Sequence, residues 1–94
     1  MFTYVGLVRL TQEGQEKLQE APKYLDKIRK IIEEEGGVLE DVCAVMGPWD
    51  FFAILKYPDN ETAFRAHAKI GMLEVVKTET FPAEKVDVFF KALV

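Results

Sequence analysis

VLEDVCAVMGPWDFFAILKY, residues Val38–Tyr57, contains two hydrophobic runs separated by the segment Gly47–Asp50. Glycine, proline and aspartate together favour a turn, since each stabilises a backbone conformation that reverses the chain. The flanking runs, Val38–Met46 and Phe51–Tyr57, are rich in the β-branched and aromatic residues typical of strands. This stretch therefore predicts an antiparallel β-hairpin.

A further strand and a helical region precede the hairpin. Phe2–Leu10 has the same strand-like composition and ends at Thr11, a residue type common at helix N-caps. From Gln12 to Glu35 hydrophobic residues recur every three or four positions, which indicates a helix, and the glycines at 36–37 would end it. Because Pro22 lacks a backbone N–H, we expect a kink there, or a break that places Pro22 in the first turn of a second helix.

A helix, a fourth strand and a last helix are expected after the hairpin. Asp59 is a candidate N-cap for a helix that extends to Ile70, and Leu73–Thr80 is strand-like. A last helix is expected from Pro82. The order β-α-β-β-α-β with an added C-terminal helix predicts an α+β, ferredoxin-like fold. Residues 1–94 are expected to form a single domain of this kind.

The composition narrows the classes of function. The 94 residues are 49% hydrophobic, and 12 basic against 16 acidic side chains give a net charge of -4. Direct nucleic-acid binding is disfavoured because it needs a basic surface. The single cysteine, Cys43, has no partner for a disulfide, which suits a cytoplasmic protein, and we expect it to be a buried hydrophobic residue. No motif for a metal, nucleotide or other cofactor is present, and no segment resembles a signal peptide or a membrane span.

The strands are hydrophobic on both faces of the expected sheet. In the strand Phe51–Tyr57, Ala53 and Leu55 point to one face while Phe52 and Ile54 point to the other. Helices on one side would leave the second face as a large exposed hydrophobic patch. We therefore expect a homodimer that packs two sheets face to face, as in a dimeric α/β barrel, with larger oligomers left open. The alternative is that the C-terminal helix of the same chain covers that face.

Several segments resemble one family along nearly the whole chain. Gly47–Asp50 with the strand after it, and VVKTETF at Val75–Phe81, resemble the GYD domain family, in which a tyrosine usually stands at the position of Trp49. Thr11 and Gly14 also match residues of that family. The hairpin is similar to the ligand-binding domain of Lrp/AsnC regulators as well. The resemblance implies a dimeric α/β-barrel fold, and it implies no agreed biochemical activity. Lrp/AsnC regulators carry an amino-terminal helix-turn-helix, and we expect none here because the residues from Phe2 onward are strand-like.

Four residues are candidates for a ligand site. Trp49 and Asp50 could hold a ligand at the hairpin, although a turn-capping aspartate and a packed indole are the stronger explanation. His67, the only histidine, is expected on a helix, at the surface or at the rim of the core, and Thr78 is expected on the fourth strand. No catalytic residue is identified. The acidic run at 33–35 is interpreted as a solvated face rather than a metal site.

Three functions follow as hypotheses. The first is a dimer that binds or senses a small molecule in a cleft at the barrel end or at the subunit interface, lined by these four residues. The second is a small enzyme of the barrel monooxygenase or isomerase kind, which requires an apolar pocket between sheet and helices with His67 pointing into it. The third is an assembly module without a ligand.

Overall fold

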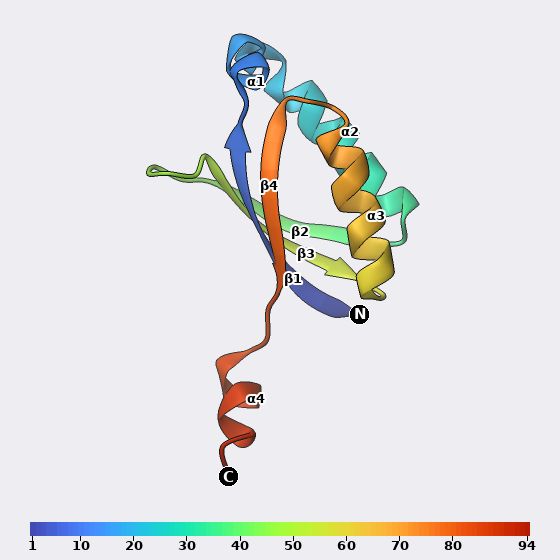
Figure 1. Cartoon of the computed structure of the whole chain (residues 1–94), viewed down its shortest axis with the longest axis vertical. Helices are drawn as coiled ribbons and strands as arrows, with labels where there is room; N and C mark the ends of the chain where they lie inside the picture. The colour runs from blue at the N-terminus through green and yellow to red at the C-terminus, as the bar shows by residue number, and fades with distance from the viewer.

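The computed structural model describes residues 1–94 as a four-stranded antiparallel sheet with helices against one of its faces (Figure 1). The strand order is β2-β3-β1-β4, so the first and third strands are central. This topology confirms the predicted α+β, ferredoxin-like fold. The elements, in chain order, are β1 Phe2–Leu10, α1 Gln12–Glu16, the 3-10 helix η1 Leu18–Glu20, α2 Ala21–Glu34, β2 Val38–Ala44, β3 Phe51–Tyr57, α3 Asn60–Gly71, β4 Val76–Pro82 and α4 Val86–Lys91.

The hydrophobic core lies between the sheet and the two long helices, α2 and α3. Tyr4 of β1 and Tyr57 of β3 are buried there with their rings in an edge-on contact, the ring centroids 5.4 Å apart. Ile32 of α2 and Ala66 of α3 are fully buried against them. The alternation of side chains along each strand places this layer on one side of the sheet only.

The opposite face of the sheet, here called the open face, carries no helix (Figure 1). At its centre Val5 and Leu7 of β1 stand opposite Ile54 and Phe52 of β3, and all four are only partly buried. The prediction that both faces are hydrophobic is therefore confirmed. Cys43 lies on this face next to Phe52 and is exposed, so the expected burial of Cys43 is wrong for the single chain.

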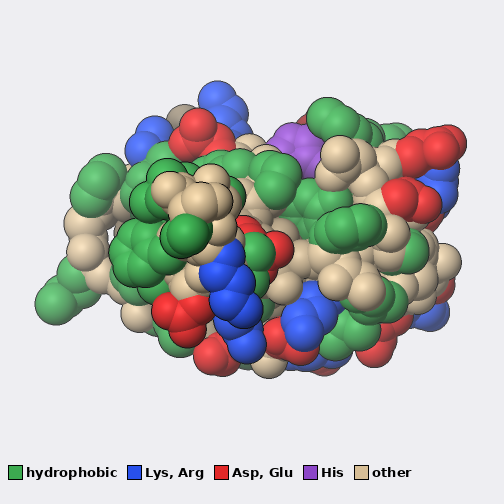
Figure 2. All heavy atoms as spheres, turned by 90° about the horizontal axis from the view of Figure 1, so that it is seen from below, with side chains coloured by type: hydrophobic (Ala, Val, Ile, Leu, Met, Phe, Trp, Pro, Cys, Tyr) green, Lys and Arg blue, Asp and Glu red, His purple; other side chains and the backbone are tan.

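The C-terminal helix α4 projects beyond the end of the sheet instead of covering the open face (Figure 1). Four of its large hydrophobic side chains, and two beside it, are exposed, and hydrophobic side chains gather at this end of the molecule (Figure 2). They are Val86, Val88, Phe89, Phe90, Leu93 and Val94. The alternative prediction, in which the C-terminal helix covers the second face of its own sheet, is therefore wrong.

The first helical region divides as Pro22 predicts. α1 and η1 end before α2, and Pro22 occupies the first turn of α2, where a missing N–H costs no hydrogen bond. Thr11 caps α1 by accepting a hydrogen bond from the Gly14 backbone N–H at 3.0 Å. Gly36 follows α2 with a φ of +85°, a left-handed conformation that glycine adopts without strain.

Three element boundaries differ from the sequence prediction. β2 ends at Ala44 rather than Met46, so the loop to β3 is wider than the predicted four residues, and the Val45 N–H bonds the Asp50 carbonyl across its base. β4 begins at Val76 rather than Leu73, since Glu74 takes a positive φ of 63° that a strand excludes. Helix α4 begins after Pro82, which instead ends β4 by pairing with β1.

Candidate functional site

A cavity of about 350 Å³ lies between the sheet and the helices α2 and α3. Its wall is mainly hydrophobic and contains no lysine, arginine, aspartate or glutamate. The central strands β1 and β3 and the helices α2 and α3 all contribute hydrophobic side chains to this wall. The main hydrophobic wall residues are Val8, Leu10, Tyr24, Leu25, Ile28, Val42, Phe51 and Ala53.

His67 and Thr78 meet on the wall of this cavity. His67 is on α3 and follows the buried Ala66, while Thr78 is on β4 and points to the helix side of the sheet. The Thr78 hydroxyl and His67 Nδ1 are 3.1 Å apart, a hydrogen bond in which either group is able to donate. This bond leaves Nε2 of the imidazole without a partner in the chain.

A second, smaller cavity of about 210 Å³ adjoins the first. His67 and Thr80 line both cavities, so these two side chains form the boundary between them. On the far side Tyr4 donates its hydroxyl hydrogen to Oδ1 of Asn60. Figure 2 shows the histidine, coloured purple, at the molecular surface among hydrophobic side chains.

The other two predicted ligand residues, Trp49 and Asp50, lie outside both cavities. Oδ2 of Asp50 accepts a hydrogen bond from the Leu10 backbone N–H at 2.8 Å, which ties the hairpin to the end of β1. The guanidinium of Arg9 lies 4.7 Å from the centroid of the Trp49 ring. Sequence reasoning thus named two residues that the fold brings together, His67 and Thr78. Thr80 was not included among the candidate residues, although its place two residues after Thr78 puts it on the same face.

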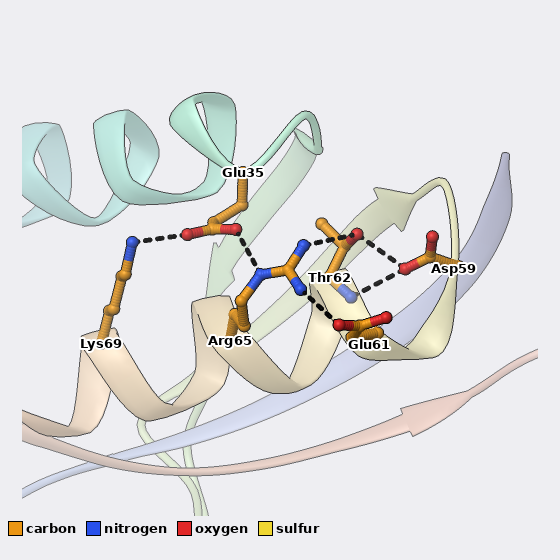
Figure 3. A network of polar contacts seen from close by, with 6 residues as sticks. All are labelled: Glu35, Asp59, Glu61, Thr62, Arg65 and Lys69. Atoms are coloured by element: carbon orange, nitrogen blue, oxygen red, sulfur yellow. Dashed lines mark hydrogen bonds and ion pairs between the residues drawn. The ribbon is translucent and has the colours of Figure 1, made fainter.

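A network of charged residues joins the end of α2 to α3 (Figure 3). Glu35 accepts hydrogen bonds from Arg65, at 3.0 Å, and from Lys69, and its side chain is only 11% exposed. These bonds from Lys69 and Arg65 lower the pKa of the Glu35 carboxyl. The expectation of a uniformly solvated acidic run is therefore wrong for Glu35, although Glu33 and Glu34 are exposed. At the start of α3, Asp59 caps the helix as predicted, by accepting the Thr62 N–H at 2.8 Å.

No group of three or more histidine, cysteine, aspartate or glutamate side chains has a geometry suited to a metal ion. None of the helices is both long and apolar enough to cross a lipid bilayer.

The topology and the cavity define a ferredoxin-like α+β domain with a hydrophobic chamber under its two long helices. Residues 4–93 match the model of the GYD domain family, and the chain belongs to that family. The resemblance seen in the hairpin and in the fourth strand is thereby confirmed.

A protein from Thermus thermophilus is similar in sequence along most of the chain. It is named glutamine synthetase and cystathionine beta-lyase binding protein, and it is 32% identical over 84 residues, which is 88% of each chain. The crystal structure of TTHA0845 from the same organism has a TM-score of 0.58 and 25% identity, covering 90% of this chain and 95% of the other. The structure of FFRP-DM1 has a TM-score of 0.61 and 16% identity, covering 89% and 100%, and supports the fold alone.

Proposed function

We propose that this protein is a homodimer that binds a small, mainly apolar molecule in the chamber between its sheet and its helices. The observation that carries the proposal is the cavity of about 350 Å³, with hydrophobic walls and one hydrogen-bonded polar pair, His67 and Thr78. Small-molecule sites are typically concave, of roughly 300 to 1,000 Å³, and lined by apolar side chains with a few polar groups that orient the ligand.

Binding suits this arrangement better than catalysis. His67 points into an apolar pocket, as an enzyme of this fold would require, yet its hydrogen-bond partner is a threonine. A histidine that acts as a general base is usually oriented by a carboxylate and placed beside a nucleophile. No acidic side chain or cysteine lines this cavity. The polar pair is therefore suited to orient a ligand through hydrogen bonds.

The open face supports the homodimer. Its hydrophobic centre, formed by Val5, Leu7, Phe52 and Ile54, is only partly buried in the single chain. Two such faces packed about 10 Å apart would remove both patches from water. A two-fold arrangement of this kind pairs the same surface on both chains. The helices then lie on the outside, and each chain keeps its own chamber.

The binding site is tested with a variant that fills the chamber. Val8 of β1 lines the cavity, and Val8→Phe adds a ring to that space. In a thermal-shift screen of small apolar compounds, hits that stabilise the wild type should fail to stabilise Val8→Phe. The matched control is Val45→Phe in the exposed hairpin loop, which should respond as the wild type does. Stabilisation of Val8→Phe by the same compounds, or no hit with the wild type, would contradict the proposed site.

A second candidate function is the binding of another protein. The Thermus relative is named for binding glutamine synthetase and cystathionine beta-lyase, and here the exposed Phe89 and Phe90 of α4 offer an unoccupied hydrophobic surface. Aromatic side chains commonly anchor protein interfaces. The test uses purified glutamine synthetase and cystathionine beta-lyase from the organism that carries this chain. It measures their binding to the wild type and to Phe89→Asp. Binding that Phe89→Asp abolishes supports this function, and no binding of either enzyme contradicts it.

A further inference from the structure

The junction between the two cavities carries hydrogen-bonding atoms that the fold does not use. The Thr80 hydroxyl makes no hydrogen bond within the chain, and Nε2 of His67 is also without a partner. Asn60 uses its Oδ1 to accept the Tyr4 hydroxyl, so its amide NH₂ remains a free donor. The smaller cavity thus collects donor groups at one end of the hydrophobic chamber.

No lysine, arginine, aspartate or glutamate lines either cavity, so the junction offers hydrogen bonds rather than an ion pair. Neither cavity is lined by an aspartate or glutamate that could pair with a cationic ligand. The side chains that face the junction are able to donate hydrogen bonds, from the Thr80 hydroxyl, the Asn60 amide and the His67 imidazole. A carboxylate accepts several such bonds, and bonds to a charged acceptor are stronger than those between neutral groups. Burial of a carboxylate is costly unless such donors surround it.

The surroundings of the smaller cavity also suit a partly hydrated group. Phe64, on its wall, is 74% exposed, whereas the residues deep in the larger chamber, such as Ile32, are fully buried. A ligand that lies across the boundary would therefore keep one end near water and the other end dry. This polarity matches a molecule with an apolar body and a single charged end.

We propose, building on the proposed function, that the ligand is a monocarboxylate with an apolar body. The body occupies the large chamber, and the carboxylate lies between His67 and Thr80 at the mouth of the small cavity, where it accepts hydrogen bonds from the two side chains and from the Asn60 amide. Thr80 then contributes to the choice of ligand, since its hydroxyl lies on the boundary and, like Nε2 of His67, has no partner within the chain.

The experiment compares octanoate with 1-octanol, which share a similar alkyl chain and differ in the polar end. His67 is the only histidine, so its imidazole signals in an NMR spectrum are assigned without ambiguity. Octanoate should shift these signals and bind the wild type more tightly than 1-octanol does. Thr80→Val, which keeps the shape of the side chain, should weaken octanoate binding about tenfold and leave 1-octanol binding unchanged. Thr3→Val, on the open face of β1, is the matched control and should bind both as the wild type does.

The outcomes separate this inference from the proposed function. Equal affinity for both compounds, no shift of the His67 signals with octanoate, or unchanged octanoate binding in Thr80→Val would overturn the carboxylate assignment. If in these cases Val8→Phe still abolishes binding, the chamber remains the ligand site. Binding of neither octanoate nor 1-octanol to the wild type overturns the carboxylate assignment, and the wider compound screen then decides the proposed function separately.

Discussion

Glu35 and Arg65 are joined by a hydrogen-bonded ion pair, with Oε2 of the carboxylate 3.0 Å from Nε of the guanidinium. The contact links the residue that follows α2 to the middle of α3, and Lys69 binds the other oxygen of the same carboxylate (Figure 3). Both helices line the proposed ligand chamber on the side opposite the sheet. The ion pair therefore holds α2 and α3 together at the end nearest Gly36.

Loss of the Glu35 charge is expected to destabilise the fold at neutral pH. Glu35→Gln removes both ion pairs and should lower the thermal unfolding temperature slightly, because the two cations are about half exposed and water screens such pairs. The matched control is Glu34→Gln, the exposed neighbour at the end of α2, which forms no ion pair. An equal effect of the two substitutions would show that the network contributes nothing specific.

Because of the same network, the stability of the fold is expected to depend on pH in the acid range. The pKa of Glu35 is lowered by its bonds to Lys69 and Arg65, so folding favours the charged carboxylate. Its contribution to stability is fully present above the ordinary value of 4.5 and is lost as the pH falls through the lower pKa of the folded state. The difference in unfolding free energy between wild type and Glu35→Gln should therefore shrink below about pH 4.5, in urea titrations at a series of pH values. A difference that stays constant down to pH 2, roughly two units below that value, would contradict the ionic origin.

Gly14 is predicted to be intolerant of a side chain. A Cβ at this position would lie 2.0 Å from the Val75 carbonyl oxygen, and that oxygen is held in place by the Thr11 N–H. Gly14→Ala should cost about 3 kcal/mol, near the upper end of typical overpacking costs. Gly71→Ala is the control, since its Cβ would meet nothing within 4 Å and alanine favours a helix. Urea unfolding measures both, and equal stabilities for the two variants would refute the close contact.

The buried hydroxyl of Tyr57 is expected to make the stability of the fold fall at alkaline pH. Burial, with a smaller effect of the Glu35 charge, raises the pKa of its hydroxyl from 10.0 to about 12. Folding therefore favours the neutral phenol, and this contribution is complete below pH 10.0 and is lost as the pH rises towards about 12. Tyr57→Phe should lose less stability than the wild type over that range. Unfolding curves at pH 9 and pH 11, roughly one unit either side of the ordinary value, test this, and identical losses in the two proteins would contradict it.

Asp50 is expected to act as a structural acceptor for the end of β1. Asp50→Ala leaves the Leu10 N–H without its partner at 2.8 Å and should cost about 1 to 2 kcal/mol. Asp50→Asn retains an acceptor oxygen and should cost less. Ligand binding in the chamber should persist in Asp50→Asn, because Asp50 lines neither cavity. Loss of binding in a folded Asp50→Asn variant would restore Asp50 to the ligand site.

The sequence was informative where local chemistry decides the structure. Pro22, Thr11 and Asp59 predicted a helix break and two helix caps, and each residue acts within a few positions of itself. The alternation of side chains in Phe51–Tyr57 likewise predicted which residues lie on each face of β3 and that both faces are hydrophobic. The position of Cys43 was misjudged because an apolar neighbourhood in sequence does not say which face of the sheet is covered.

The candidate site was predicted only in part, because cavities depend on contacts between distant segments. His67 and Thr78 were named separately, and their hydrogen bond exists because α3 lies against β4. Trp49 and Asp50 were grouped with them, although the hairpin loop instead binds the end of β1. The volume of the chamber depends on how far α2 stands from the sheet, and no residue pattern encodes that distance.

The pairing of two chains through the open face is tested most directly by the molar mass in solution. Light scattering at micromolar concentration should give twice the chain mass of 10.7 kDa for the wild type, or a larger even multiple. Phe52→Lys, which places a charge at the centre of the open face, should give the mass of one chain while keeping the circular dichroism of the fold. A wild-type mass of 10.7 kDa would contradict the homodimer.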